Sequence, residues 1–176
     1  MKHILKQKMQ TDPVLIRPAK EADIPYLRDI FNYEIENTTV IFDIHPKTTE
    51  NRMEWLRAHN CDNHPLIVAE LDGRAVGYAS LSPYRIYEAY RETVELSVYV
   101  DRNYRGRGIA KKLLQSILDD ARNRSDIHTV ISVITGDNEV SIRLHEQFGF
   151  TCCGTMREVG RKFGKLLDIV NYQLIV

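Results

Sequence analysis

The stretch "VYVDRNYRGRGIAKKLL", residues 98–114, changes character halfway along its length. It begins with β-branched and aromatic residues typical of a strand, and it ends with apolar residues at helical spacing. Arg105-Gly106-Arg107-Gly108 lies between the two halves. Glycine lets a ligand approach the backbone closely, and a helix N-terminus offers unpaired N–H groups to an anion. The stretch therefore predicts an anion site at a strand-to-helix junction, with a tight turn that needs glycine for bending alone as the alternative.

Two common phosphate-binding motifs are excluded. The chain contains no G-x-x-x-x-G-K-[ST] string, the signature of P-loop proteins. The dinucleotide fingerprint G-x-G-x-x-G fails because Lys111 stands where the third glycine belongs, and the stretch does not lie early in a βαβ unit. We therefore expect neither NAD nor a nucleoside triphosphate.

The composition bounds the class of protein. A length of 176 residues predicts one domain, residues 13–176, after a polar N-terminal tail, residues 1–12. Lys+Arg and Asp+Glu balance at 24 each, so the charge favours neither nucleic acid nor a membrane as partner. No apolar run reaches the roughly 20 residues that span a bilayer, and the tail does not resemble a secretory signal. The cysteines, Cys61, Cys152 and Cys153, favour a reducing, cytoplasmic location and show no metal-ligand spacing, so no metal is expected.

Periodicity outside this stretch predicts interspersed strands and helices. Strands are expected at residues 14–19, 65–70, 74–82, 93–100, 128–134, 150–160 and 166–176. Helices are expected at residues 20–37, 49–59, 109–121 and 138–148. Asp72-Gly73 predicts a hairpin turn. This order favours an α/β or α+β domain on one mostly antiparallel sheet.

Two motifs resemble those of the GCN5-related N-acetyltransferases (GNAT). "RGRGIA", residues 105–110, matches the signature [QR]-x-x-G-x-[GA], which holds the pyrophosphate of acetyl-CoA in that family. "NEVSIRLHEQFGF", residues 138–150, resembles its N-x-x-[AS]-x-x-x-[YH]-x-x-x-GF helix. The resemblance implies the GNAT fold, a twisted, mostly antiparallel sheet of about seven strands flanked by about four helices. It implies an acetyl-CoA site formed by Val98, Tyr99, Val100, Arg105, Gly106, Arg107, Gly108, Ile109, Ala110, Lys111, Asn138 and Ser141.

Longer strings resemble a narrower branch, the phosphinothricin and methionine sulfoximine/sulfone N-acetyltransferases. They are residues 78–100, 141–150 and 158–169, and the likeness extends over nearly all of residues 14–174. Glu95 matches the glutamate taken as the catalytic base of this branch. Alternation along residues 93–100 independently puts Glu95 on the more polar face of its strand, where an ordinary surface carboxylate is the alternative. A carboxylate whose pKa is raised by burial can accept the proton that a substrate amine must lose, and backbone N–H groups at residues 98–100 can stabilise the developing oxyanion.

His145 and Asn138 each have two interpretations. His145 is expected to act as proton donor or second base, since imidazole titrates near neutrality, and a structural histidine is the alternative. Asn138 suits a helix N-cap as well as the coenzyme contact that the resemblance implies.

The segment "YRIYEAYRE", residues 84–92, is expected to select the substrate. The resemblance places Arg85, Ile86 and Tyr87 against the substrate, with Glu95, Leu96 and Ser97 from the next strand. Arg85 can pair bidentately with an α-carboxylate, although a mobile loop with incidental charges is the alternative. Many phosphinothricin-type members carry a second arginine at the position of Tyr87, so its aromatic ring favours the less charged sulfoximine or sulfone.

The resemblance therefore implies transfer of an acetyl group from acetyl-CoA to the α-amino group of a small amino-acid analogue, directly in a ternary complex. The resemblance implies a homodimer, with residues 37–39 and 87–90 as the place where a second subunit contributes. Acetylation of a protein N-terminus or a polyamine, and a non-catalytic acyl-CoA sensor, are the alternatives.

Overall fold

The computed structural model describes residues 14–176, so the tail predicted at residues 1–12 lies outside the described residues. Residues 14–176 form seven strands and four α-helices in the predicted order. The strands are β1 Leu15–Pro18, β2 Leu66–Leu71, β3 Arg74–Pro83, β4 Thr93–Val100, β5 Thr129–Thr135, β6 Thr151–Lys162 and β7 Lys165–Ile175. The helices are α1 Ile24–Asn37, α2 Thr49–Arg57, α3 Ile109–Arg122 and α4 Glu139–Gln147.

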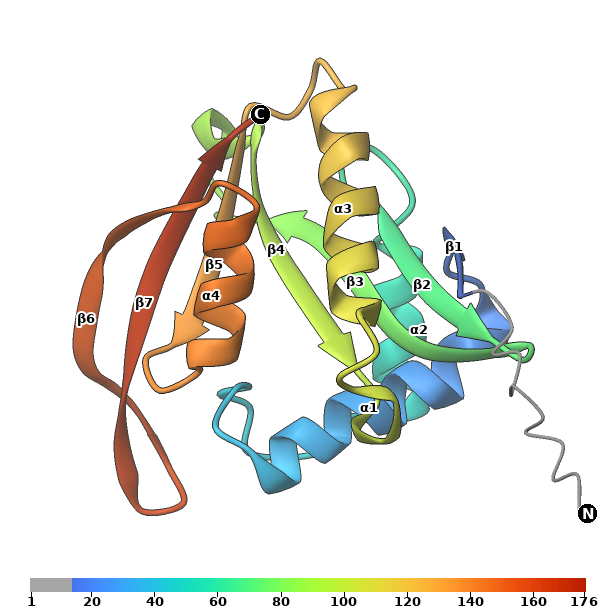
Figure 1. Cartoon of the computed structure of the whole chain (residues 1–176), viewed down its shortest axis with the longest axis horizontal. Coiled ribbons are helices and arrows are strands. Elements are labelled where there is room, and N and C mark those ends of the chain that lie inside the picture. The colour runs from blue at the N-terminus through green and yellow to red at the C-terminus, as the bar shows by residue number, and fades with distance from the viewer. Residues whose placement is uncertain (1–13) are drawn as a thin grey trace, which may run out of the picture.

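The seven strands form one sheet in the order β1-β2-β3-β4-β5-β7-β6. Neighbouring strands run antiparallel except β4 and β5, which are parallel, so the prediction of a mostly antiparallel sheet is confirmed. β4 and β5 pair at only three positions, ending at Glu95 and Ile131. Beyond Glu95 the two strands separate (Figure 1). One edge of the second half of β4 therefore lacks a neighbouring strand.

The helices cover both faces of the sheet. α3 and α4 pack on one face, and α1 and α2 on the other (Figure 1). The helical spacing predicted one apolar face for α3, and its residues Ile109, Leu113, Leu114, Ile117 and Ala121 are all at most 2% exposed. Burying one large aliphatic side chain contributes about 1.5–3 kcal/mol. This face holds α3 firmly against the sheet and fixes where its N-terminus points.

Short polar signals set the helix ends. The Thr48 side chain accepts a hydrogen bond from the Asn51 N–H at 3.2 Å, which starts α2. α1 begins later than predicted, because residues 21–23 form a 3₁₀ turn in which the Asp23 carboxylate pairs with Arg17. Asp72 and Gly73 both have positive φ in the predicted hairpin turn.

Two further sequence-based points concern the surface. Cys152 and Cys153 lie exposed on β6, at the edge of the sheet. Within residues 14–176, no helix is long and apolar enough to cross a membrane.

Candidate active site

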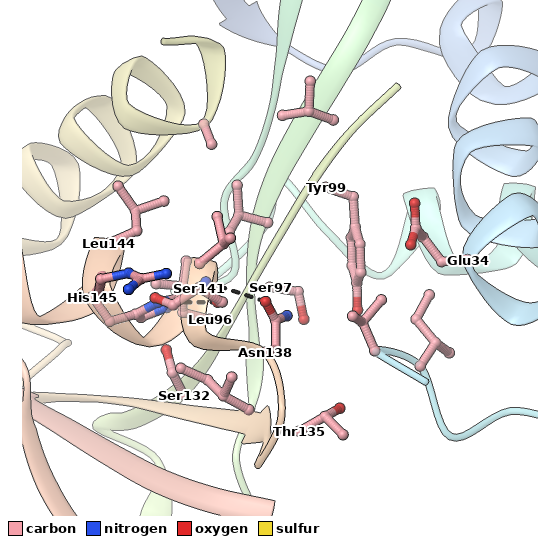
Figure 2. A pocket seen from close by; sticks show the side chains of 18 of the residues that line it. Glu34, Leu96, Ser97, Tyr99, Ser132, Thr135, Asn138, Ser141, Leu144 and His145 are labelled. Atoms are coloured by element: carbon pink, nitrogen blue, oxygen red, sulfur yellow. Dashed lines mark hydrogen bonds between the residues drawn. The ribbon is translucent and has the colours of Figure 1, made fainter. Parts of the chain in front are cut away.

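A cavity of about 1090 Å³ lies where β4 and β5 separate. Its walls come from β4, the loop before α3, β5, α4 and the segment that follows α1 (Figure 2). Small-molecule sites commonly measure about 300–1,000 Å³. The cavity is therefore large enough for an extended ligand beside a smaller one.

The cavity brings together most of the residues that the sequence singled out. They are Glu95, Leu96, Ser97, Val98, Tyr99 and Val100 from β4, Arg105, Gly106, Gly108, Ile109, Ala110 and Lys111 around the start of α3, and Asn138, Ser141 and His145 from α4. Four others, Arg85, Ile86, Tyr87 and Arg107, do not line it. Their roles stay predictions, as do the roles of the lining residues.

The N-terminus of α3 opens into this cavity without a capping side chain. Gly108 takes the N-cap position with a φ of +74°, and no side chain bonds to the first turn. A Cβ atom built on Gly106 or Gly108 meets nothing within 4 Å, so the space above the loop is open. Unpaired N–H groups and the helix dipole favour an anion here. The loop therefore fits the pyrophosphate group that the resemblance implies.

The free edge of β4 forms the next part of the wall. Past Glu95, the backbone groups of β4 that face β5 have no strand partner, and such groups are strong donors and acceptors. The Arg105 Nε donates to the Val100 carbonyl at 3.2 Å, which holds the loop against the end of β4. This edge can bind an extended chain that carries amide groups, as the pantetheine arm of coenzyme A does.

Glu95 lies on the last paired position of β4, half-buried in the cavity wall. Burial raises the pKa of its carboxyl, and the positive charge of Arg85 offsets part of that rise. The side chain lies on the same face as Ser97 and Tyr99, as the alternation predicted. A carboxylate with a raised pKa at this point is suited to accept a proton from a bound amine.

His145 is 2% exposed and lies on α4 beside Phe150. Its Nδ1 lies 2.8 Å from the Ser141 carbonyl oxygen. A carbonyl only accepts, so the proton is assigned to Nδ1, which leaves Nε2 unprotonated in the neutral ring. Burial lowers the pKa of His145, and the bond to Ser141 offsets part of that change. The ring is therefore neutral near pH 7, and its Nε2 is an acceptor.

Asn138 caps α4. Its side-chain oxygen accepts from the Ser141 N–H at 3.2 Å (dashed in Figure 2), which confirms the N-cap prediction. Tyr99 also faces the cavity, and its poorly solvated surroundings raise the pKa of its hydroxyl to about 12. Tyr99 therefore stays protonated and offers a hydrogen-bond donor to the cavity.

Several cavity residues were missed by the sequence analysis. Glu34 from α1, Val40, Ile41 and Phe42 from the segment after it, and Tyr104, Ser132, Val133, Ile134, Thr135, Val140, Arg143, Leu144, Gln147, Val159 and Ile169 also line the wall. Glu34 had a signal in the sequence, because it lies seven residues after Leu27 and four after Ile30 on the buried stripe of α1. A carboxylate buried on such a stripe is energetically costly unless it is paired, so its position predicts a buried partner.

The predicted substrate segment is largely exposed. Ile86 is 94% exposed and Tyr87 is 68% exposed. The Arg85 guanidinium stacks on the Tyr84 ring at 4.6 Å. Arg85 acts on the cavity through its charge, which reaches Glu95.

Comparison with known proteins agrees with this geometry. Residues 27–150 match the Acetyltransferase (GNAT) family. The chain is 38% identical to the L-methionine sulfoximine/L-methionine sulfone acetyltransferase of Salmonella typhimurium, over 90% of this chain and 92% of that protein. It is 41% identical to the phosphinothricin N-acetyltransferase of Streptomyces coelicolor, over 93% of this chain and 96% of that protein.

Solved structures extend the likeness to the fold. A ribosomal-protein-alanine N-acetyltransferase from Brucella melitensis superposes with a TM-score of 0.89 at 46% identity, over 92% of this chain and 99% of that one. A Salmonella typhimurium acetyltransferase solved with its cofactor acetyl-CoA gives a TM-score of 0.89 at 37% identity, over 93% of this chain and 94% of that one. The seven-stranded sheet, the split between β4 and β5 and these matches together show that the chain is an enzyme of the GNAT acetyltransferase family.

Proposed function

We propose that this enzyme transfers an acetyl group from acetyl-CoA to the α-amino group of a small amino acid of the methionine sulfoximine, methionine sulfone or phosphinothricin type. One observation carries the proposal: Glu95, with its raised pKa, lies in the same cavity as the uncapped N-terminus of α3. The names of the Salmonella and Streptomyces relatives support this substrate class.

The cavity walls provide a binding site for acetyl-CoA, which supplies the acetyl group when bound. The N–H groups at the start of α3, with Lys111 in the wall and Arg107 in the same loop but outside the wall, would hold the diphosphate. The free edge of β4 would pair with the pantetheine amides, and its backbone N–H groups near residues 98–100 would stabilise the negative charge that develops on the thioester oxygen. Both ligands are bound at once, so transfer is direct.

Glu95 is the proposed base. Its carboxylate would accept one proton from the substrate ammonium, so that the nitrogen lone pair can attack the thioester carbonyl. The new C–N bond forms as the C–S bond breaks, coenzyme A leaves as its thiolate, and the second proton that the nitrogen loses neutralises this thiolate. His145 suits an acceptor or second base better than a proton donor, because Nδ1 holds the proton of its neutral ring. Glu34 is not a candidate base, since Arg105 and Thr38 occupy both of its oxygens.

Arg85 is the proposed anchor for the substrate carboxylate. Its guanidinium reaches Glu95 electrostatically, so a carboxylate held there brings the neighbouring α-amino group towards the base. At position 87 this chain has a tyrosine and not a second arginine, which favours the sulfoximine or sulfone over the doubly anionic phosphinothricin.

We propose a homodimer, which would cover the exposed substrate segment. Ile86, Tyr87 and Tyr90 are 94%, 68% and 42% exposed, and aromatic residues are enriched at interfaces. Sedimentation at micromolar concentration tests this: a single species of twice the chain mass is expected, and a monomer contradicts it. A cytoplasmic location and the division into residues 1–12 and 13–176 stay predictions.

A second candidate function is acetylation of an alanine at a protein N-terminus. The name of the Brucella melitensis protein, 46% identical to this chain, favours it. A peptide substrate has no α-carboxylate next to its reacting amine, so it would leave Arg85 without a partner. A non-catalytic coenzyme sensor would require neither Glu95 nor His145 in the wall.

A thiol-release assay separates these functions. Acetyl-CoA is incubated with L-methionine sulfone, L-methionine sulfoximine, phosphinothricin, spermidine or an alanine-ended peptide, and free coenzyme A is followed. We expect the highest kcat/KM with the sulfone or sulfoximine. Turnover of the peptide alone would contradict the proposal, and coenzyme binding without turnover of any amine would support the sensor.

A further inference from the structure

Glu34 and Arg105 form an ion pair across the cavity that the proposed chemistry does not use. Glu34 projects from α1 towards Tyr99 (Figure 2), and the Arg105 Nη2 donates to its Oε1. The Glu34 side chain is only 4% exposed, whereas the Arg105 side chain is 48% exposed. A buried carboxylate is costly without a partner. The pair therefore fixes the loop before α3 to α1.

The second oxygen of Glu34 extends this link to the cavity wall. The Thr38 hydroxyl lies 3.0 Å from the Glu34 Oε2 and 2.9 Å from the Glu34 backbone carbonyl oxygen, so its single proton is shared between these two acceptors. The Val40 N–H donates to the same Thr38 oxygen at 3.3 Å. Val40, Ile41 and Phe42 line the cavity. Glu34 thus holds the start of the segment that forms this wall.

The far side of the same segment is fixed by the sheet. The Thr135 hydroxyl donates to the Thr39 carbonyl at 3.0 Å, and the Lys162 Nζ donates to the Ile41 carbonyl at 2.6 Å. Residues 38–42 are therefore held from β5 and β6 on one side and from Glu34 on the other. Movement of Glu34 would shift one of the two attachments of this wall.

Arg105 has one nitrogen left for a ligand. Its Nε donates to Val100 and its Nη2 to Glu34, while Nη1 has no hydrogen-bond partner within residues 14–176. Arg105 directly precedes the glycine loop that fits a diphosphate. A guanidinium is planar and rigid, so a phosphate oxygen on Nη1 would restrain Nη2 and, through it, Glu34.

We propose that Arg105 is a positioning residue that couples the two ligand sites: coenzyme binding at the loop orders Glu34 and residues 38–42, and the amine then binds more tightly. This inference rests on the proposed function, which supplies the amine. Coupling of this kind is reciprocal, so the amine must strengthen coenzyme binding by the same factor.

Calorimetric titration measures the coupling directly. L-Methionine sulfone is titrated into the enzyme without and with saturating coenzyme A, and the ratio of the two Kd values is the coupling factor. In the wild type we expect a factor of about 5–150 in favour of the coenzyme-bound enzyme. Glu34→Gln should bring the factor close to one while largely retaining the Kd for coenzyme A, and Arg105→Gln should weaken coenzyme binding and also lose the coupling.

Arg107→Gln is the matched control, because Arg107 lies in the same loop and does not contact Glu34. It should weaken coenzyme binding while the coupling factor stays at the wild-type value. A wild-type factor of one, or a folded Glu34→Gln variant that keeps the wild-type factor, would overturn the inference.

A second variant covers the case in which Glu34→Gln does not fold. Thr38→Val keeps the shape and the ion pair but removes the link from Glu34 to Val40, so it too should reduce the coupling factor. A Thr38→Val variant with the full wild-type factor would overturn the inference. Absence of wild-type turnover on every amine would overturn the proposed function and the inference together, whereas turnover without coupling would overturn the inference alone.

Discussion

Glu95 on β4 lies opposite Ile131 on β5 at the last position where the two parallel strands pair. One residue further on, the strands separate, and the cavity begins between them. The fold therefore places a carboxylate at the point where an unpaired strand edge starts. An extended ligand on that edge would present its end beside Glu95, which gives the proposed base its position.

Replacing the base tests that position. Glu95→Gln keeps the size of the side chain but cannot accept a proton, so kcat should fall by about 10²–10⁴-fold. The Kd for coenzyme A should stay within a factor of about two, since Glu95 does not touch the loop before α3. Steady-state kinetics and calorimetry measure the two effects. An unchanged kcat and an unchanged pH–rate profile would remove Glu95 from the role.

Arg85 should control the pH dependence of the reaction. Its positive charge lowers the pKa of Glu95, against the rise that burial causes. In Arg85→Gln the pKa of Glu95 should rise further, so the base stays protonated to a higher pH. The acidic limb of the pH profile of kcat/KM should therefore move to higher pH. The KM for the amine should also rise, because Arg85 is the proposed anchor for the substrate carboxylate.

The control for Arg85 is Arg91→Gln. Arg91 belongs to the same segment, but its side chain is 73% exposed and faces Asp62 at 3.6 Å. Its removal should leave the acidic limb where it is in the wild type. Equal shifts of the acidic limb in Arg85→Gln and Arg91→Gln would show that the total positive charge of the segment, and not Arg85 itself, sets the position of this limb.

Gly108 and Gly73 form a matched pair for the coenzyme loop. Both have a φ of +74°, and a Cβ on either meets nothing within 4 Å. Alanine at each should cost a similar unfolding free energy, about 1–2 kcal/mol for the left-handed backbone. Only Gly108→Ala should also raise the KM for acetyl-CoA, because Gly108 is the N-cap of α3, where the diphosphate is expected to approach the backbone. Equal KM values in both variants would contradict a ligand at this loop.

Buried histidines should make the fold sensitive to mild acid. Burial lowers the pKa of His59 and of His145 in the folded chain, whereas an unfolded histidine titrates near 6.5. Below pH ~6.5 the unfolded chain binds protons that the folded chain does not, so the unfolding free energy should fall as the pH drops towards the folded pKa values. At pH 7.5 the His59→Phe variant should have a lower unfolding free energy than the wild type. Between pH 7.5 and 5.5, however, its unfolding free energy should fall by less than that of the wild type, as measured by urea unfolding at the two pH values. If the unfolding free energy of His59→Phe fell with pH as steeply as that of the wild type, this account would be contradicted.

The local features of the site could be predicted from the sequence. Strand alternation put Glu95 on the polar face of β4, the spacing of apolar residues gave the buried face of α3, and Asn138 identified the start of α4. Each of these depends on residues within one element. The same holds for Gly108, whose positive φ belongs to the junction itself.

The cavity wall formed by the segment after α1 could not be predicted in this way. Lys162 and Ile41, which join through one hydrogen bond, are 121 residues apart in the chain. The Phe42 ring lies so close to Gly160 that a Cβ there would sit 2.3 Å from it. Periodicity within either segment carries no trace of such contacts, because they arise only when the β6–β7 hairpin folds back over residues 38–42. The helical spacing of α1 puts Glu34 on the buried stripe, but it does not identify its partner Arg105, which lies on a distant loop.

The central claim is that a small amino acid, held beside Glu95, is the substrate. A competition assay tests it most directly: equal concentrations of L-methionine sulfone and an alanine-ended peptide share one reaction with limiting acetyl-CoA, and mass spectrometry quantifies both acetylated products. The ratio of products equals the ratio of kcat/KM values. We predict that N-acetylmethionine sulfone exceeds the acetylated peptide by at least about 10²-fold, and that Arg85→Gln reduces this ratio. An excess of acetylated peptide in the wild type would contradict the claim.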